Sequence, residues 1–372
     1  MNNKKRIEDY LTSDYIYLPY YDGMKVLVKD KEYINKNELI LYSDDKKVNS
    51  SVSGSVLGLT KINNIKYIVI ENDFKDKLKT RMGVKRNLSD YTKEEFLCLV
   101  KEYGLDTFSS NSKVLVINGI DEYMGEVTYD TLLKEYTIEI LDTIDALIDI
   151  MNIKKCFLAM NNSDIECVNN MFNNIGTYPK IDLKLFSNDF SIGIKSILVN
   201  KLTNYKHKNY DVMYLNIKDV LNMYNILRRK RPMSETFITL TGDNIDYTKV
   251  VRVKIGTNLV DILNYFNIDK DKHIIINGLL NGISLKNNNF IIDHNVRSIF
   301  VSDDVFYKES NCINCGECIS ACPIHINPRY MYFNNNKKSK SYKEKCIGCG
   351  ICSYVCPSKI NLHKGVVYND KK

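Results

Sequence analysis

The chain has 372 residues, more than one ordinary domain holds. Its 17 glycines and 6 prolines fall below the usual shares of about 7% and 5%, which excludes collagen-like and linker-rich classes. The 52 basic and 45 acidic residues give a net charge of +7, an excess too small to indicate nucleic-acid binding. No run approaches about 18 apolar residues and the start resembles no signal peptide, so we expect a cytoplasmic protein that meets a membrane only through partner subunits.

The first segment, 1–73, is rich in short β-prone runs separated by turn-like breaks. These runs are 24–28, 38–42 and 52–59. Their order looks like the β barrel-sandwich of lipoyl and biotinyl carriers. Lys46 or Lys47 is then a candidate carrier lysine, but neither has the spacing to Gly54 that a lipoyl hairpin shows. We interpret the segment as structural.

The second segment, 74–231, has a mixed α/β pattern. The all-apolar run 114–117 predicts a strand buried on both faces, and 156–160 predicts another. Between them, apolar residues recur at three- and four-residue intervals and predict one buried helix face. That face comprises Ile138, Leu141, Ile144, Leu147, Ile148 and Met151. Strand, helix and strand in this order form the unit of a parallel sheet.

The third segment, 232–303, begins at Pro232 after the basic quartet 228–231. The quartet is either a solvated linker or a docking site for an acidic partner. Beyond it we expect a small mixed domain. Its predicted elements are strands at 236–242, 250–255 and 274–276 and a helix at 259–266.

Eight of the eleven cysteines lie in the last segment, 304–372. Without an export signal, such a cluster indicates metal binding rather than disulfides. Two runs, 312–323 and 346–357, fit C-x2-C-x2-C-x3-C-P. The remaining cysteines are Cys98, Cys156 and Cys167. The apolar surroundings of Cys98 and Cys156 predict small buried hydrophobic side chains.

The spacing of these cysteines predicts two 4Fe-4S clusters. Three cysteines spaced by two residues hold three corners of a cube from one tight turn, and Gly316 and Gly350 relieve crowding there. The fourth cysteine cannot comfortably return to the same cube, and in two-cluster ferredoxins it serves the other one. The expected ligands are Cys312, Cys315, Cys318 and Cys356 for one cluster, and Cys346, Cys349, Cys352 and Cys322 for the other. Zinc is the alternative, although zinc sites usually pair two C-x2-C arms across a longer loop.

Between the two motifs, segment 337–345 carries five lysines. They either steer an acidic redox partner, such as a ferredoxin or a flavodoxin-like protein, or belong to a solvated loop. His325 is a candidate for tuning a cluster, but we interpret it as a surface residue.

The whole chain resembles the C subunit of the Rnf electron-transport complex and, equally, the proline-reductase-associated electron-transfer protein of anaerobic clostridia. The most specific match is 352–360, and further matches are 239–243, 252–257 and 278–282. The resemblance implies four domains: a barrel-sandwich (1–73), a Rossmann-like α/β domain (74–231), a β-grasp-like domain (232–303) and a two-cluster ferredoxin-type domain (304–372). It also implies an electron-transfer subunit of an oxidoreductase, with other redox proteins or Rnf or reductase subunits as partners.

That family binds flavin and NADH through a G-x-G-G-x-G-F-P loop and an N-G-x-E element after the next strand. Here 118–122 keeps part of the second element, so Asp121 and Glu122 are candidate cofactor contacts. A backbone that approaches phosphates closely needs several glycines. Segment 105–111 has none, and only Gly83 and Gly104 occur between 74 and 113. We therefore expect no FMN and no NADH site.

Three hypotheses follow from these observations. The first is an iron-sulfur protein that relays single electrons between redox partners, with its flavin site lost. The second is an NADH-oxidising flavin and iron-sulfur subunit, and the third is an iron-sulfur scaffold or redox sensor. Bound flavin would favour the NADH-oxidising subunit over the other two hypotheses. Rapid reoxidation of the clusters by a redox partner would favour the electron-relay protein over the scaffold or sensor.

Overall fold

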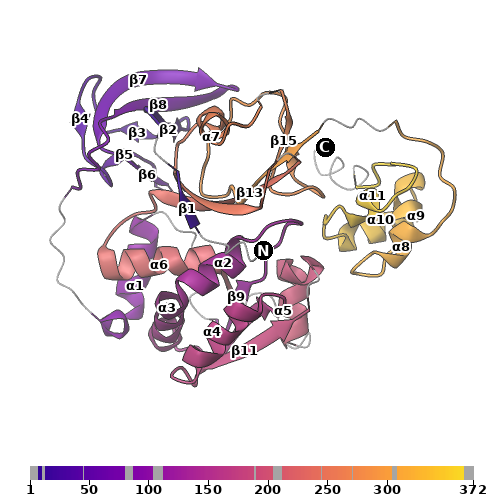
Figure 1. The fold of residues 1–372 in the computed structure, drawn as a ribbon. Helices are drawn as coiled ribbons and strands as arrows, with labels where there is room; N and C mark the ends of the chain where they lie inside the picture. Colours follow the sequence, from indigo (N-terminus) through magenta and orange to yellow (C-terminus); the bar gives the residue numbers. More distant parts are fainter. Residues whose placement is uncertain are drawn as a thin grey trace.

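The computed structural model describes most of the chain. The described ranges are 7–10, 13–44, 46–79, 87–103, 112–187, 190–203, 212–243, 245–269, 271–303 and 308–363. The architecture is mixed α/β, and the cysteine-rich tail (308–363) lies beside β15 (His273–Ile276), away from the N-terminal strands (Figure 1). No helix in these ranges is both long enough and apolar enough to cross a membrane.

The N-terminal strands form two small antiparallel sheets. One has the order β2-β8-β7-β4 and the other β3-β5-β6. Their bounds are β2 Tyr15–Tyr20, β3 Lys25–Val26, β4 Tyr33–Ile34, β5 Leu39–Tyr42, β6 Lys47–Asn49, β7 Gly54–Ile62 and β8 Ile65–Asn72. Alternate side chains of β2, Ile16 and Leu18, are fully buried in the shared core. Lys46 lies between β5 and β6 with its Nζ 4.6 Å from the Tyr21 ring centroid, and Lys47 opens β6.

The first strand belongs to a different sheet from its neighbours in sequence. β1 (Ile7–Asp9) pairs in parallel with β14 (Lys249–Lys254), and Asp9 accepts a 2.6 Å hydrogen bond from Arg252 Nε. Six strands make up this sheet in the order β1-β14-β13-β17-β15-β16. The remaining bounds are β13 Glu235–Gly242, α7 Leu259–Tyr265, β16 Ile283–Ser284 and β17 Ser298–Ser302. The predicted strands and helix of 232–303 are thus confirmed, while β1, β16 and β17 were not foreseen.

A four-stranded parallel sheet, here called the central sheet because its strands come from the middle of the chain, has the order β11-β10-β9-β12. Its strands are β9 Val114–Gly119, β10 Lys155–Asn161, β11 Ile181–Phe186 and β12 Val212–Asn216. The strands predicted at 114–117 and 156–160 are confirmed as β9 and β10. The helices of this region are α1 Lys93–Glu102, α2 Thr128–Glu135, α3 Thr137–Ile150, α4 Ile165–Ile175, α5 Lys195–Thr203 and α6 Ile217–Arg229.

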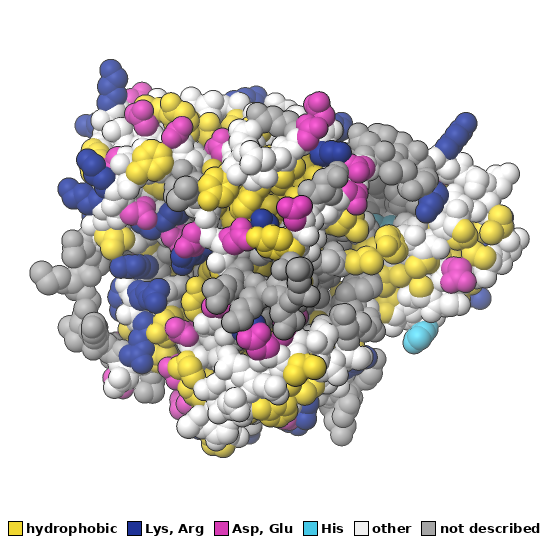
Figure 2. Space-filling model, in the orientation of Figure 1, with side chains coloured by type: hydrophobic (Ala, Val, Ile, Leu, Met, Phe, Trp, Pro, Cys, Tyr) yellow, Lys and Arg dark blue, Asp and Glu magenta, His cyan; other side chains and the backbone are white. Residues whose placement is uncertain are grey.

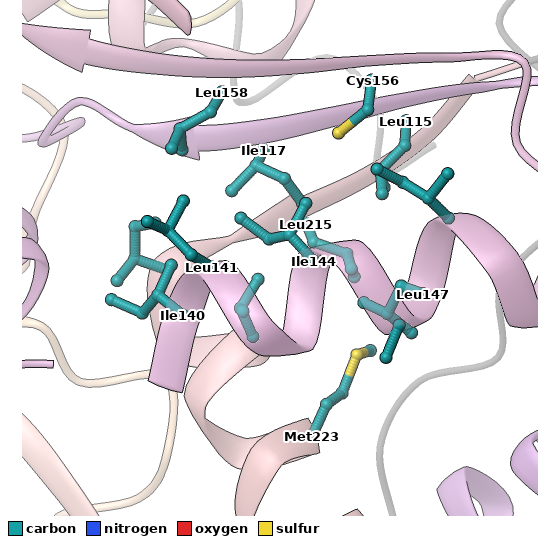
Figure 3. Close-up of a cluster of buried hydrophobic side chains, with 14 of the residues drawn as sticks. Leu115, Ile117, Ile140, Leu141, Ile144, Leu147, Cys156, Leu158, Leu215 and Met223 are labelled. Carbon is teal, nitrogen blue, oxygen red and sulfur yellow. The ribbon is translucent and has the colours of Figure 1, made fainter. Parts of the chain in front are cut away.

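Helices cover both faces of the central sheet. Leu115 and Ile117 of β9 pack with α3 and α6, and Figure 3 shows them with side chains such as Ile144 and Met223. Val114 and Val116 share a second cluster with residues of α5. Because both faces are covered, every residue of β9 is buried, as the apolar run predicted.

Two side chains predicted to be buried are exposed. Ile138 is 47% exposed, because it lies in the first turn of α3 at the edge of the buried stripe, about 120° around the helix axis from Ile144 at about 100° per residue. Cys98 is exposed on α1, whose buried face carries Phe96 and Val100. Burial of Cys156 is confirmed, and it raises the pKa of that thiol to about 12.

The tail is made of four short helices. They are α8 Glu317–Ser320, α9 Pro328–Phe333, α10 Lys337–Lys345 and α11 Ile351–Tyr354. The lysine-rich segment is therefore a helix rather than a loop. Asn336 caps its start by accepting from Ser339 N, and the buried Ser339 hydroxyl donates to Asn334 O at 2.6 Å.

The tail meets the six-stranded sheet's 278–282 loop at a close backbone contact. A Cβ placed on Gly350 would lie 2.2 Å from the carbonyl oxygen of Leu280, and Asn281 Nδ2 lies 3.5 Å from Gly348 O. Real Cβ atoms do not approach a carbonyl so closely, so this seat requires glycine at position 350. We call this contact the Leu280 seat.

Gly350→Ala should loosen the Leu280 seat, because the added methyl group displaces a backbone carbonyl. Gly316→Ala is a matched control, since Gly316 has a similar φ of 83° against 79° but no neighbouring atom within 4 Å of a Cβ. In both variants, alanine at positive φ lowers the free energy of unfolding by about 1–2 kcal/mol. Hydrogen exchange of segment 278–282 should accelerate in Gly350→Ala alone; equal rates in both variants would show that the seat does not form.

Candidate metal centres and the polar network of the central sheet

The tail contains two cavities, each lined by four cysteines. One is lined by Cys312, Cys315, Cys318 and Cys356, and the other by Cys322, Cys346, Cys349 and Cys352. Each cavity is lined by three cysteines of one motif and the fourth of the other, and the crossed ligand sets stay a prediction. Cys318, Cys352 and Cys356 share one buried cluster, so the two cavities adjoin.

Each motif builds its cavity with the same local conformation. Gly316 and Gly350, at φ 83° and 79°, precede the short helices α8 and α11, which carry the third cysteine of each motif. The fourth cysteine follows the helix in a tight turn, where Cys322 N donates to Ile319 O. Positive φ favours glycine, because a Cβ would crowd the following carbonyl.

The chemistry of these donor sets fits an iron-sulfur cluster. Burial raises the pKa of Cys352 to about 12 and also raises that of Cys318, Cys346 and Cys349. As free thiols they would stay protonated near neutral pH, so the thiolates need a cationic metal core in contact with them. Soft thiolate sets of four suit Fe-S clusters or zinc. In the described ranges, no group of three or more His, Cys, Asp or Glu side chains is arranged around a single metal ion, and the two cysteine sets line cavities instead.

His325, considered above as a tuning residue, is exposed, which confirms it as a surface residue. It adopts φ 54° just after Cys322, and its N–H donates to Cys322 O at 3.0 Å. Its role is therefore in the turn that follows the fourth cysteine.

A second candidate site lies at the point in the central sheet where the order of successive strands reverses. The chain runs from β9 outward to β10 and β11 and then returns to β12 on the other side of β9. Ligands of open α/β sheets bind at such switch points, outside the carboxyl ends of the strands. Here the carboxyl ends of β9 and β12 bring Asn118 and Tyr214 together, with Asn118 Nδ2 2.9 Å from Tyr214 Oη.

This switch point is filled by a network of the chain's own side chains. Glu122 accepts hydrogen bonds from Tyr214 Oη at 3.1 Å and Asn118 Nδ2 at 3.2 Å, and its other oxygen pairs with Arg297 Nη2 at 2.6 Å. Arg297 also donates to the buried Tyr129 hydroxyl and lies 4.8 Å from the Tyr123 ring centroid. Arg297 directly precedes β17, a strand of the six-stranded sheet. Nothing in the sequence around it therefore indicates that it contacts Glu122 at the switch point.

The other candidate cofactor contact, Asp121, is also engaged within the chain. Its Oδ1 accepts from Tyr129 N at 2.9 Å, in the first turn of α2. Burial, together with Glu126 and Asp130 nearby, holds its pKa well above the ordinary value. A cofactor role for Asp121 and Glu122 stays a prediction. Gly83, Gly104 and the glycine-free segment 105–111 lie outside the described residues.

Glu126 gives this network a testable pH dependence. Burial raises its pKa from 4.5 to about 7, and its Oε1 has no hydrogen-bond partner among the described residues. Between these two values the folded chain holds a proton that the unfolded chain releases, so the carboxyl's contribution to stability falls as pH rises. The variant Glu126→Gln has no ionisable group at this position. Its free energy of unfolding, relative to that of the wild type, should therefore rise by about 1–3 kcal/mol from pH 5 to pH 8. Melting curves at both pH values test this, and a constant difference would contradict it.

Basic side chains gather around a cavity of about 200 Å³ between β6 and the end of α6. They are Lys47, Lys79, Arg229, Lys230 and Arg231. Figure 2 shows Lys and Arg side chains on this side of the molecule. The basic quartet thus closes a helix, where cations offset the helix dipole, rather than forming a free linker. Lys79 is paired with Glu38 at 2.7 Å and Lys230 lies over the Tyr91 ring.

Comparison with known proteins shows similarity along most of the chain. The family of 4Fe-4S dicluster domains matches residues 306–362. The C subunit of the ion-translocating oxidoreductase complex of Buchnera aphidicola subsp. Baizongia pistaciae is 25% identical over 364 residues, covering 86% of this chain and 72% of that protein. The C subunit of the proton-translocating ferredoxin:NAD(+) oxidoreductase complex of Clostridium ljungdahlii is 24% identical over 340 residues, covering 81% and 73%. For the ion-translocating complex's C subunit in Actinobacillus succinogenes, the match covers 64% of this chain but 36% of the relative.

Among solved structures, the crystal structure of an NAD+-reducing [NiFe]-hydrogenase in the air-oxidized state is 13% identical. It matches with a TM-score of 0.48 over 72% of this chain and 53% of that chain. The sequence matches confirm the resemblance to the C subunit of the Rnf complex. The chain is an Rnf C-like iron-sulfur electron-transfer protein.

Proposed function

We propose that this Rnf C-like protein binds two 4Fe-4S clusters through crossed cysteine sets and relays single electrons between redox partners. The observation that carries the proposal is the pair of adjoining cavities, each lined by three cysteines of one motif and the fourth of the other. When bound, the clusters supply one-electron chemistry at potentials that their surroundings set. The chain holds the thiolates and keeps the two centres close together.

The partners that we propose are other subunits of a membrane-associated oxidoreductase complex. Relatives named as C subunits of oxidoreductase complexes support this. The chain would then meet the cytoplasmic face of a membrane through those subunits. We also propose that α10, with Lys337, Lys338, Lys340 and Lys345 exposed, steers an acidic redox partner toward the clusters.

We further propose that the chain has lost the family's flavin and NADH site. Supporting this, the switch-point crevice is filled by Glu122, Arg297 and Tyr214, and the candidate contacts already have partners within the chain. The alternative, an NADH-oxidising flavin subunit, is favoured by the Clostridium relative's name, which includes NAD(+). The finer domain interpretation, with barrel-sandwich, Rossmann-like and β-grasp-like parts, belongs to this proposal.

Metal and flavin analysis of anaerobically purified protein tests the proposal. We expect about eight iron and eight acid-labile sulfide per chain, since each cluster contributes four of each. Flavin should be absent. Zinc at stoichiometric level with little iron would overturn the cluster assignment, whereas eight iron together with one FMN would overturn only the loss of the flavin site.

A further inference from the structure

The tail is an internal repeat that extends beyond the cysteine motifs. After the fourth cysteine, both halves read C-P-x-x-I-N-x, and the residue that follows is Arg329 in one half and His363 in the other. The backbone repeats as well. His325 and Lys359 have φ values of 54° and 56°, and each donates its N–H at 3.0 Å to the carbonyl of the cysteine three residues earlier. Arg329 and His363 therefore occupy equivalent positions.

Each of these two residues lines a different cysteine cavity. Arg329 lines the cavity of the Cys312 set. The Asn314 backbone and, to a smaller extent, the Arg329 side chain lower the pKa of the Cys312 thiol, and the Arg329 backbone partly offsets the rise that burial causes in the pKa of Cys318. His363 lines the cavity of the Cys346 set, and its Nε2 is buried without a hydrogen-bond partner among the described residues. One cavity therefore has a permanent cation where the other has an imidazole.

The two cavities differ in solvent access mainly at one ligand. In the first, Cys315 is exposed and its neighbour Ile313 is 66% exposed, while Cys312 is half-buried and Cys318 and Cys356 are buried. In the second, Cys322 and Cys352 are buried and Cys346 and Cys349 are half-buried. Reduction adds one negative charge to a cluster. A nearby cation and access to water both stabilise that charge, whereas an apolar, enclosed cavity disfavours it.

We propose that Arg329 raises the reduction potential of one cluster above that of the other. A single electron then occupies the cluster of Cys312, Cys315, Cys318 and Cys356. This inference rests on the cluster assignment proposed above. The Cys346 loop faces the rest of the chain at the Leu280 seat, so the two centres also differ in position. The electron-rich cluster is the one with an exposed ligand, where an outside partner can exchange electrons with it.

Redox titration of the complete, cluster-loaded chain at pH 8, followed by electron paramagnetic resonance, tests the role of Arg329. We expect two separate potentials in the wild type. Arg329→Gln should make reduction of the higher-potential cluster about tenfold less favourable, which is about 59 mV for one electron, and leave the other potential unchanged. Arg329→Lys keeps the charge and should retain most of the separation. His363→Arg, the reciprocal change, should raise the lower potential.

The outcomes distinguish this inference from the function on which it rests. Eight-iron protein whose higher potential is unchanged in Arg329→Gln overturns the role of Arg329 and leaves the cluster assignment intact. A shift confined to the lower-potential cluster also overturns it. A chain that takes up zinc in place of iron under anaerobic conditions overturns both. Arg329 is exposed, so its substitution should leave the fold intact, and iron analysis of each variant checks that both clusters are still bound.

Discussion

Cys322→Ser is expected to damage the cluster held by Cys346, Cys349 and Cys352 and to spare the one held by its own motif. The reason is the crossed geometry, in which Cys322 lines the cavity of the second motif. Cys356→Ser should do the reverse, because Cys356 lines the cavity of the first. Each variant should retain about half of the iron. Electron paramagnetic resonance of the reduced proteins should show the loss of different signals in the two variants.

Cys98→Ser is the control for these substitutions, because Cys98 is an exposed cysteine on α1 outside the tail. It should retain both clusters. If Cys322→Ser disturbed only the cluster of Cys312, Cys315 and Cys318, each motif would hold its own cluster and the crossed assignment would be wrong. Loss of both clusters in both variants would show instead that the two centres assemble only together.

The turn that each cysteine motif forms could be predicted from the sequence because its geometry is local. Cysteines spaced by two residues, followed by glycine and then a C-P pair, define a tight turn whatever the remainder of the fold does. Strands β9 and β10 were predictable for a similar reason. Their uniform apolar composition reflects burial on both faces, which neighbouring residues alone report.

Features that depend on contacts between distant segments could not be predicted. Arg297 reaches Glu122 across 175 residues of sequence, and nothing in its immediate neighbourhood signals that pairing. The pairing of β1 with β14 has the same cause, because the two strands lie far apart in the sequence. Apolar neighbours in the sequence do not bury Cys98, because the helix period places it opposite Phe96 and Val100, whereas Ile138 has the spacing of a buried residue but lies at the edge of the buried stripe.

Two separate observations bear on the flavin site. In the sequence, the stretch that should supply phosphate-binding glycines has none between 105 and 111. The structural argument concerns the switch point, where Arg297, with 14% of its side chain exposed, is paired with Glu122. Breaking such a buried pair costs about 3–5 kcal/mol. A ligand that displaced Arg297 would have to supply that energy from its own contacts.

NADH alone is therefore expected to leave the visible absorbance of the clusters unchanged under anaerobic conditions. Hydride transfer from NADH needs a flavin to divide two electrons into single ones, and we expect none. Dithionite or a reduced ferredoxin should bleach the same absorbance promptly, which controls for intact clusters. Adding FMN to the purified chain should not change the result, because the crevice is filled. Prompt bleaching by NADH, or stoichiometric FMN in the native protein, would contradict the prediction and favour the dehydrogenase hypothesis.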